Sequence, residues 1–412
     1  MRIVFIAWRN LLRNRRRTLI TAFSVAFGVL LSVTFTASGD YTYTNMINSS
    51  ATMGFGHVTI AAKGYNDTPT LTRRLVAAEE LRRQVLSNHE VENAYVRIAG
   101  QAMFAAGVKS IGGQVIGVHP LQERPEHNLF IRSIIQGILP ADSESTGALI
   151  GAKMAEKLNL RLGKKLIYTL TDRKGDLVSG MSRVSGIFQT GEDMVDSSVV
   201  LLPINRLRRL LGYDAGDASL ISVLIWDQRG ADLVRQKLIG SLQQTGYEIL
   251  TWAETQADLA GLIAIDRAGN YLMQFLVGLL IAAGILNTLL MSVMERTREF
   301  GMMMALGMSP VQVVIMVMVE SLMIGLLGLF LGAVITTPWY IYMAGTGIDF
   351  SSQIGQDYST SGVLVDPVMK FRLFKESVIG ILAGVFILTL LAGIFPAIKA
   401  GRVPPLASIR GI

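Results

Sequence analysis

The side chains best suited to bind a metal ion or transfer protons are the four histidines, which are His57, His89, His119 and His127. Their spacing matches no pattern of metal ligands. The sequence has no nucleophile elbow and no zinc-protease motif, and GAKMAEK and LGKKL both depart from the phosphate-binding form G-x-x-x-x-G-K followed by Ser or Thr. We therefore expect no catalytic residue, no metal and no cofactor in this chain.

The segment ERTREFGMMMALGMSP, residues 295–310, offers a different chemistry, which is the pairing of charges with another protein. Glu295, Arg298 and Glu299 share a face of a short helix because helical neighbours lie three and four residues apart. The apolar side chains that back this face are Phe300, Met302 and Met303. The segment is too short for a domain and too charged to remain in lipid, so we expect it at a membrane surface.

The residues after this helix predict a sharp turn back toward the membrane. Gly307 suits a left-handed helix end, Ser309 suits the cap of the next helix, and Pro310 suits its first turn. We predict that residues 295–309 form a short helix, parallel to the membrane, that docks on a soluble partner. The alternative is a solvated hairpin that only connects two spans.

Four apolar runs must position this segment, and they are residues 18–38, 270–294, 310–336 and 377–396. Each is long enough to cross a bilayer, which takes about 20 apolar residues. Half of the chain is hydrophobic and only 17% of it is charged, which is typical of an integral membrane protein. We expect an α-helical membrane protein with four transmembrane helices.

Arginines gather before the first span, and they are Arg2, Arg9, Arg13, Arg15, Arg16 and Arg17. By the positive-inside rule they hold the N-terminus in the cytosol, and we prefer an uncleaved anchor to a signal peptide that ends in SVTFTAS. Residues 1–17 then form a basic amphipathic helix along the inner surface, with Trp8, Leu11 and Leu12 toward lipid and arginines toward phosphates. The same topology places 295–309 and the tail 397–412 in the cytosol, and the polar loop 342–375 outside.

Residues 39–268 lie outside the membrane in this topology, and their pattern alternates between strands and helices. GHVTIAAKGY, VENAYVRIAGQAMFAAG and SSVVLLPI are strand-like, whereas GALIGAKMAEKLNLR looks like a helix that leads into a strand. The pattern predicts a large extracytoplasmic α+β domain of two lobes between helices 1 and 2, whose ends at 50–130 and 216–255 pack together. Because the chain has no cysteine, an apolar core must hold this domain.

Small and polar residues within the spans indicate contacts between helices. Glycines four residues apart allow close helix approach, and we place them at a dimer interface: Gly328, Gly332, Gly380 and Gly384. Glu320 lies within the third span, where we expect it to be hydrogen-bonded toward the bundle interior; the alternative is a proton relay or a conformational lock. Hydrogen bonds between helices are also expected for Asn270, Gln274 and Asn287.

The chain resembles the permease superfamily that contains MacB, FtsX and the lipoprotein-releasing LolC and LolE subunits. The resemblance rests on WRNLLRNRRRT before the first span, ERTREFGMMMALGMS between spans two and three, and FPAIKAGRVPPLASIR at the end. GHVTIAAKGY and DRAGNYLMQF are more similar to the LolE-like branch than to FtsX. The resemblance implies that the extracytoplasmic domain is MacB-like. It also implies a coupling helix that fits a separate ATPase, with these residues: Glu295, Arg296, Thr297, Arg298, Glu299, Phe300, Gly301, Met302 and Gly307.

The resemblance further implies a permease subunit that is not itself an enzyme, in a bacterial inner (cytoplasmic) membrane with both termini cytosolic. Its partners would be a cytosolic ABC ATPase that binds ATP and Mg²⁺, a second copy or a paralogous permease, and a periplasmic adaptor or carrier, with no nucleic acid. The implied function is mechanotransmission that extracts or exports lipoprotein or another amphiphilic substrate. The alternatives are an FtsX-like signalling scaffold for a cell-wall hydrolase and MacB-like efflux of peptides or antibiotics.

Overall fold

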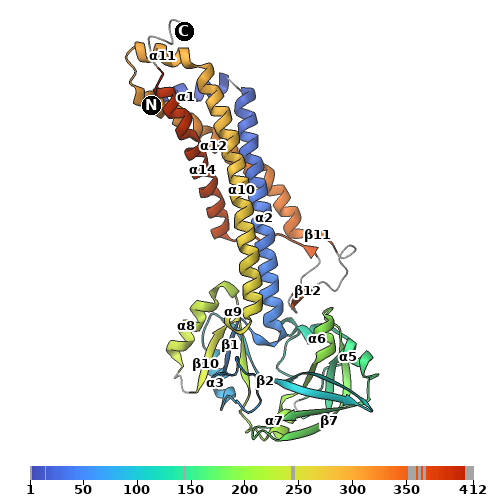
Figure 1. Ribbon diagram of the computed structural model, residues 1–412. Coiled ribbons are helices and arrows are strands. Elements are labelled where there is room, and N and C mark those ends of the chain that lie inside the picture. The colour runs from blue at the N-terminus through green and yellow to red at the C-terminus, as the bar shows by residue number, and fades with distance from the viewer. Residues whose placement is uncertain are drawn as a thin grey trace. The chain divides into compact units, whose positions relative to one another are not determined.

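The computed structural model describes residues 2–13, 15–142, 144–242, 246–350, 359–360, 363–364 and 368–403. The chain folds as two compact units (Figure 1). We call Met1–Thr42, Ala264–Ile348 and Val368–Ile412 the membrane unit, and Tyr43–Ile263 with Asp349–Pro367 the external unit.

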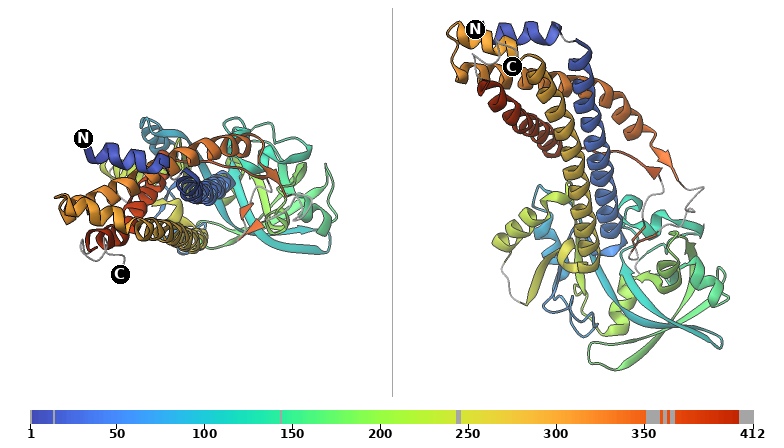
Figure 2. Two further views of the ribbon diagram at one scale, coloured as in Figure 1. Left: turned by 90° about the horizontal axis from the view of Figure 1, so that it is seen from above. Right: turned by 45° about the horizontal axis from the view of Figure 1, so that its top comes forward.

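Long helices make up most of the membrane unit. The helices that contribute to it are α1 (Arg2–Arg13), α2 (Arg15–Ser50), α10 (Ala257–Glu295), α11 (Thr297–Ala305), α12 (Pro310–Gly345) and α14 (Lys375–Gly401). Four of them, α2, α10, α12 and α14, are long and apolar enough to cross a membrane. Both views in Figure 2 show α2 and α10 side by side. Short strands flank the connection between the last two long helices: β11 (Ile348–Asp349), β12 (Ser359–Thr360), β13 (Val363–Leu364) and β14 (Val368–Met369).

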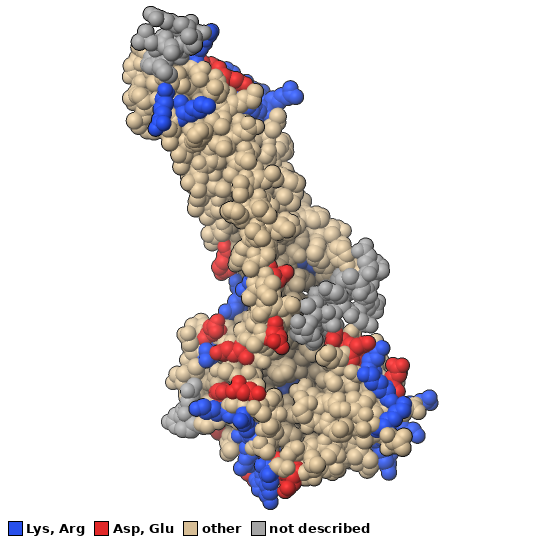
Figure 3. Space-filling model, in the orientation of Figure 1, with Lys and Arg blue, Asp and Glu red and all other residues tan. Residues whose placement is uncertain are grey.

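Branched aliphatic side chains hold the four long helices together. Those buried in one cluster are Val25, Val29, Ile281, Ile285, Leu289, Ile324, Ile381 and Val385. Polar side chains also join α10 to α2, because Asn270 donates to the carbonyl of Phe35 at 3.3 Å and Gln274 donates to the hydroxyl of Thr36 at 2.9 Å. On the face that Figure 3 shows, charged side chains of this unit gather beside α1 and α11 and are nearly absent from the middle of the bundle.

The helices extend beyond the apolar runs that predict them, because adding a residue to an existing helix costs much less than starting a new one. The third continues to Gly345, so the expected loop at 342–375 is wrong at its first residues. The fourth continues to Gly401, which shortens the expected tail at 397–412. Residues 351–358, 361–362, 365–367 and 404–412, on which parts of these two predictions fall, lie outside the described residues.

A ten-stranded mixed sheet is the centre of the external unit. Its strands are β1 (Val58–Ala62), β2 (Val91–Ala106), β3 (Lys109–Val118), β4 (Ile134–Gly137), β5 (Gly147–Gly151), β6 (Lys165–Thr171), β7 (Leu177–Phe188), β8 (Val199–Pro203), β9 (Leu220–Ile225) and β10 (Tyr247–Thr251). The order is β10-β1-β9-β2-β3-β8-β5-β7-β4, with β6 between β2 and β7. The two ends of the domain therefore meet, because β1 pairs with both β9 and β10.

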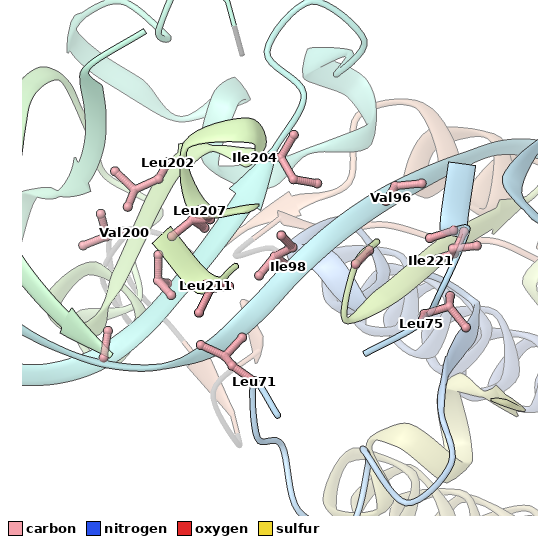
Figure 4. Close-up of a cluster of buried hydrophobic side chains, with 14 of the residues drawn as sticks. Leu71, Leu75, Val96, Ile98, Val200, Leu202, Ile204, Leu207, Leu211 and Ile221 are labelled. Carbon is pink, nitrogen blue, oxygen red and sulfur yellow. The ribbon is translucent and has the colours of Figure 1, made fainter. Parts of the chain in front are cut away.

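Strand β2 joins two parts of this sheet, one formed by β10, β1 and β9 and the other by β3, β8, β5, β7 and β4. Its residues 91–97 pair with β9, and its residues 98–106 pair with β3. The remaining elements are α3 (Ala78–Val85), α4 (Leu129–Arg132), α5 (Ala152–Lys157), α6 (Asp193–Ser198), α7 (Ile204–Leu211), α8 (Ala231–Ser241), α9 (Trp252–Thr255), the π-helix η1 (Ala51–Phe55) and the 3₁₀ turns η2 (Pro125–His127) and η3 (Gln228–Gly230). An apolar core continues from one part of the sheet to the other, and Figure 4 shows Val96 and Ile221 at one side with Val200, Leu202 and Leu211 at the other.

The expected helix at GALIGAKMAEKLNLR is wrong for its first five residues. Gly147–Gly151 form β5, which pairs with β7 on one side and β8 on the other, and α5 begins only at Ala152. All five residues are buried. A strand buried on both faces has a continuous apolar pattern, which periodicity cannot distinguish from a buried helix.

His57 joins the end of α2 to the sheet. Its Nε2 lies 2.9 Å from Oδ1 of Asn48, and its Nδ1 accepts from the backbone N–H of Ile225 at 3.2 Å. Its own carbonyl accepts from the N–H of Trp252, the first residue of α9. Burial lowers the pKa of His57 from 6.5 to about 4, although the nearby Asp227 carboxylate acts in the opposite direction. The native state therefore holds a neutral imidazole.

Acidification is expected to destabilise the external unit between about pH 6.5 and pH 4. The unfolded chain protonates His57 in this window and the native chain does not, so stability is complete above pH 6.5 and falls by about 3 kcal/mol toward pH 4. Amide hydrogen exchange of β1 and β9 in the full chain at a series of pH values measures this loss. His57→Gln should flatten the dependence, and an unchanged slope in that variant would assign the effect to other groups.

Candidate functional site

The segment between α10 and α12 has the turn that its sequence predicts, but the predicted helix over 295–309 is too long. Glu295 is the last residue of α10, Arg296 caps the next helix, and α11 covers only Thr297–Ala305. α11 ends at Ala305, and Gly307 adopts a left-handed conformation with φ 101°. The hydroxyl of Ser309 accepts from the N–H of Gln312, whose side chain accepts from the N–H of Ser309, and Pro310 occupies the first position of α12. The predicted helix end, cap and first turn are confirmed.

α11 has a buried face and an exposed face. Phe300 is 1% exposed and packs among apolar side chains of α10, α12 and α14, and Gly301 is also buried. Arg298 and Met302 are one helical turn apart and both exposed, and Leu306 follows on the same side with 88% of its surface exposed. The expectation that Phe300, Met302 and Met303 back the charged face together is therefore wrong for Met302, because a residue four positions after Arg298 shares its face. The expectation that Glu299 shares this face is also wrong, because Glu299 pairs with Arg296 and Arg13.

Five side chains form a series of hydrogen bonds that begins and ends on α1 and joins it to α11 and α12. Asn10 donates to Glu320 at 2.7 Å, and Nη1 of Arg296 donates to both oxygens of Glu320 at 3.0 and 3.2 Å. Nε of Arg296 donates to Glu299 at 2.9 Å, and Glu299 accepts from Arg13 at 2.7 Å. Because Asn10 and Arg13 both belong to α1, the backbone of this helix completes the loop. We call these five residues the charge ring.

A second contact fixes the start of α2 against the end of α10. Nη1 of Arg17 lies 2.6 Å from Glu295, and Nη2 of the same arginine donates to Ser292 at 2.8 Å. The expectation that the arginines of residues 1–17 face phosphates is therefore wrong for Arg13 and Arg17, since acidic side chains of this chain pair with both. Trp8 is exposed, as expected for a side chain that faces lipid, but the same expectation is wrong for Leu11, which packs against the apolar cluster of the long helices.

The predicted glycines divide into two groups. A Cβ at Gly328 would lie 2.5 Å from Cβ of Val25, and a Cβ at Gly332 would lie 2.9 Å from Cβ of Val29, so both glycines admit α2 of the same chain. Their assignment to a dimer interface is corrected by this contact. Gly380 and Gly384 on α14 are exposed and have no atom within 4 Å of such a Cβ among the described residues, which leaves them accessible to another helix.

The other intramembrane polar residues also differ in their surroundings. Glu320 points into the bundle, where it accepts the hydrogen bonds of the charge ring. Asn287 lies on an exposed face of α10, on the same side as the open Gly284 three residues earlier. It therefore faces away from the helices of its own chain.

Two family descriptions match this sequence. A MacB-like periplasmic core domain matches residues 18–240, which is more than half of the chain, and an FtsX-like permease C-terminal region matches residues 271–405. The chain belongs to the MacB/FtsX superfamily of ABC transporter permeases. The external unit of this permease accordingly contains a MacB-like α+β domain between the first and second membrane helices.

Curated relatives agree with this assignment. The permease is 24% identical to an uncharacterized ABC transporter permease of Methanocaldococcus jannaschii, over 99% of this chain and 98% of the relative. It is 22% identical to the lipoprotein-releasing system transmembrane protein LolC of Xylella fastidiosa, over 76% and 78%. It is 24% identical to the macrolide export ATP-binding/permease protein MacB of Escherichia coli strain K12, over 84% of this chain and 54% of MacB.

Among solved structures, the periplasmic region of MacB from Actinobacillus actinomycetemcomitans matches 52% of this chain with a TM-score of 0.35 and 12% identity. The family assignment and the four apolar helices make this permease a multi-pass membrane protein. ABC permeases of this type work with a cytosolic ATPase subunit.

Sequence reasoning missed part of the charge ring. The sequence predicts functional positions for Arg296, Glu299 and Glu320, whereas it predicts contact with phosphates for Arg13 and no role for Asn10. Their spacing of three residues places them on one face of a helix, which is a usable signal. Their partners lie 310 and 286 residues away along the chain, so spacing alone could not identify them.

Proposed function

We propose that this permease is the membrane subunit of an ABC transporter that works with a separate cytosolic ATPase, which binds ATP and Mg²⁺. Residues 295–309 are the coupling helix that docks on this ATPase. Movement of the ATPase pair displaces α11, the long helices tilt, and the MacB-like domain changes conformation. The permease chain itself transmits this movement and catalyses no reaction.

The division of α11 into two faces carries this proposal. Arg298, Met302 and Leu306 are exposed on one side, which suits a partner surface with an acidic group and an apolar pocket. Phe300 and Arg296 fix the opposite side to the membrane helices. A hairpin that only connects two spans needs neither an exposed apolar anchor nor a buried ion pair.

The topology of the proposal follows from the arginines of α1 and α2. Arg13 and Arg17 pair with Glu299 and Glu295, so the N-terminal arginines and α11 lie at the same end of the membrane unit. The positive-inside rule supports a cytosolic location for that end. Ala397 and Ala400, near the end of α14, pack in the same cluster as Phe300 of α11, which supports a cytosolic location for the end of α14 as well.

Lipoprotein or another amphiphilic molecule, extracted from the outer leaflet, is the proposed substrate, because LolC is named as part of a lipoprotein-releasing system. MacB-like efflux is the second candidate, since other relatives are named for macrolide and pyoverdine export. An FtsX-like scaffold for a cell-wall hydrolase is the third. The transporter works as a dimer, and the open faces of Gly380 and Gly384 suit close contact with a second copy or a paralogous permease.

Reversal of the exposed face of α11 tests the proposal. Arg298→Glu combined with Met302→Glu is expected to weaken ATPase binding at least about tenfold, because loss of central interface anchors typically costs 2 kcal/mol or more. The permease is purified from its native membrane in mild detergent, and the proteins that remain bound are identified and quantified by mass spectrometry. Acylated proteins beside the ATPase would support lipoprotein as the substrate.

A matched control places the same changes elsewhere. Arg209→Glu with Met103→Glu replaces two exposed side chains of the external unit and should leave ATPase binding unchanged. An ATPase that remains bound to the α11 variant at the wild-type level would show that α11 is not the docking element. A cell-wall hydrolase in place of acylated proteins would favour the scaffold.

A further inference from the structure

The ion pairs of the charge ring differ in burial. Arg296 and Glu320 each have 7% of their side-chain surface exposed, whereas Arg13 and Glu299 are 55% and 39% exposed. An exposed ion pair contributes little to stability, but removal of one partner from a buried pair is strongly destabilising because the other charge stays desolvated. The contact between Arg296 and Glu320 therefore dominates the ring.

This contact joins two elements that are otherwise held by apolar packing. Arg296 is the residue before α11 and lies over the ring of Phe300, 5.2 Å from its centroid, so its position is tied to that of the helix. Glu320 lies ten residues after Pro310, the first residue of α12, which is about three helical turns into this helix. Apolar contacts allow sliding, whereas the charge-assisted bonds from Nη1 of Arg296 to both oxygens of Glu320 fix the distance between the two side chains.

From α12, two contacts lead to other helices of the bundle. Gly328 lies two turns after Glu320 and packs directly on Val25 of α2. Ser321 donates to the carbonyl of Thr389 in α14 at 3.1 Å. α12 therefore connects Arg296 to α2 by packing and to α14 by a hydrogen bond.

We propose that Glu320 is a positioning residue that makes the coupling helix and α12 move as one body, and that Asn10 and Arg13 extend this body to α1. This inference rests on the proposed function of α11. Docking of the ATPase uses the exposed face of α11, and transmission uses the charge ring on its buried side. The two functions are therefore separable by mutation.

Glu320→Gln tests this separation. The chain has no cysteine, so spin labels are attached at Ile341→Cys in α12 and Ile379→Cys in α14, both of which are exposed. The labelled chain with its co-purified ATPase is placed in lipid nanodiscs, and the label distance is measured by pulsed electron spin resonance with and without ATP and Mg²⁺. We expect Glu320→Gln to keep the ATPase bound and to lose the ATP-dependent shift in distance.

Two further variants keep the result interpretable. Glu144→Gln makes the same chemical change in an exposed pair of the external unit, with Arg209, and should retain the shift. Arg296→Met with Glu320→Met leaves no buried charge, so the bundle should fold, but the ring is broken and the shift should still be lost. A normal shift in that double variant, or in a folded Glu320→Gln chain, would overturn the proposal. Absence of a bound ATPase from the unmutated chain would instead overturn the proposed function.

Discussion

Arg97→Leu is expected to lower the free energy of unfolding of the external unit by about 3 to 5 kcal/mol, because it leaves the carboxylate of Glu123 buried without its charged partner. The two side chains are each 1% exposed, and Nη2 of Arg97 donates to Glu123 at 3.2 Å. The guanidinium also lies over the ring of Tyr95. Arg97 is the last residue of β2 to pair with β9, so the loss falls where β2 changes partners. Hydrogen exchange of β2 in the full chain measures it.

A double variant distinguishes charge burial from loss of packing. Among the described residues, Nε and Nη1 of Arg97 and Oε1 of Glu123 have no hydrogen-bond partner, so the native pair is only partly satisfied. Arg97→Leu with Glu123→Leu removes both charges and should recover most of the lost stability. If the double variant is as unstable as Arg97→Leu alone, shape rather than charge determines the stability at this position.

Gly56→Ala is expected to destabilise the external unit by more than about 3 kcal/mol, because two independent costs coincide. Gly56 has φ 78° and ψ 174°, a conformation that costs other residues about 1 to 3 kcal/mol. A Cβ there would also lie 2.6 Å from the backbone nitrogen of Val223 and 2.8 Å from its carbonyl oxygen. Relief of this clash would separate β1 from β9, and thermal unfolding of the full chain would report the loss.

Gly107→Ala is the matched control for the backbone cost. Gly107 also has a positive φ, 61°, at the turn between β2 and β3, but no atom lies within 4 Å of an added Cβ among the described residues. We expect a loss of only about 1 kcal/mol from the left-handed conformation. Equal losses for Gly56→Ala and Gly107→Ala would show that β9 yields to the added methyl group.

The sequence predicts what local patterns determine and misses what tertiary contacts determine. Apolar run lengths give the four long helices, and Gly307 with Ser309 gives the turn after α11, because each signal lies within a few residues. β5 is missed because burial on both faces removes its periodicity. The glycine pairs look alike as sequence, and only packing shows that Gly328 meets α2 while Gly380 remains open. The charge ring needs partners that no local pattern can supply.

The pairing of β1 has a consequence for how the protein is made. Val58 of β1 pairs with Thr251 of β10, which is synthesised about 190 residues later. At a typical 5–20 residues per second, β1 waits on the order of 10 to 40 seconds for this partner. Over that time the edge of β1 that later pairs with β10 is open to wrong pairing and aggregation. β10 is the last strand of the ten-stranded sheet to be synthesised, and α10 begins only six residues after it. Completion of the sheet and insertion of the second membrane helix are therefore consecutive steps of biosynthesis.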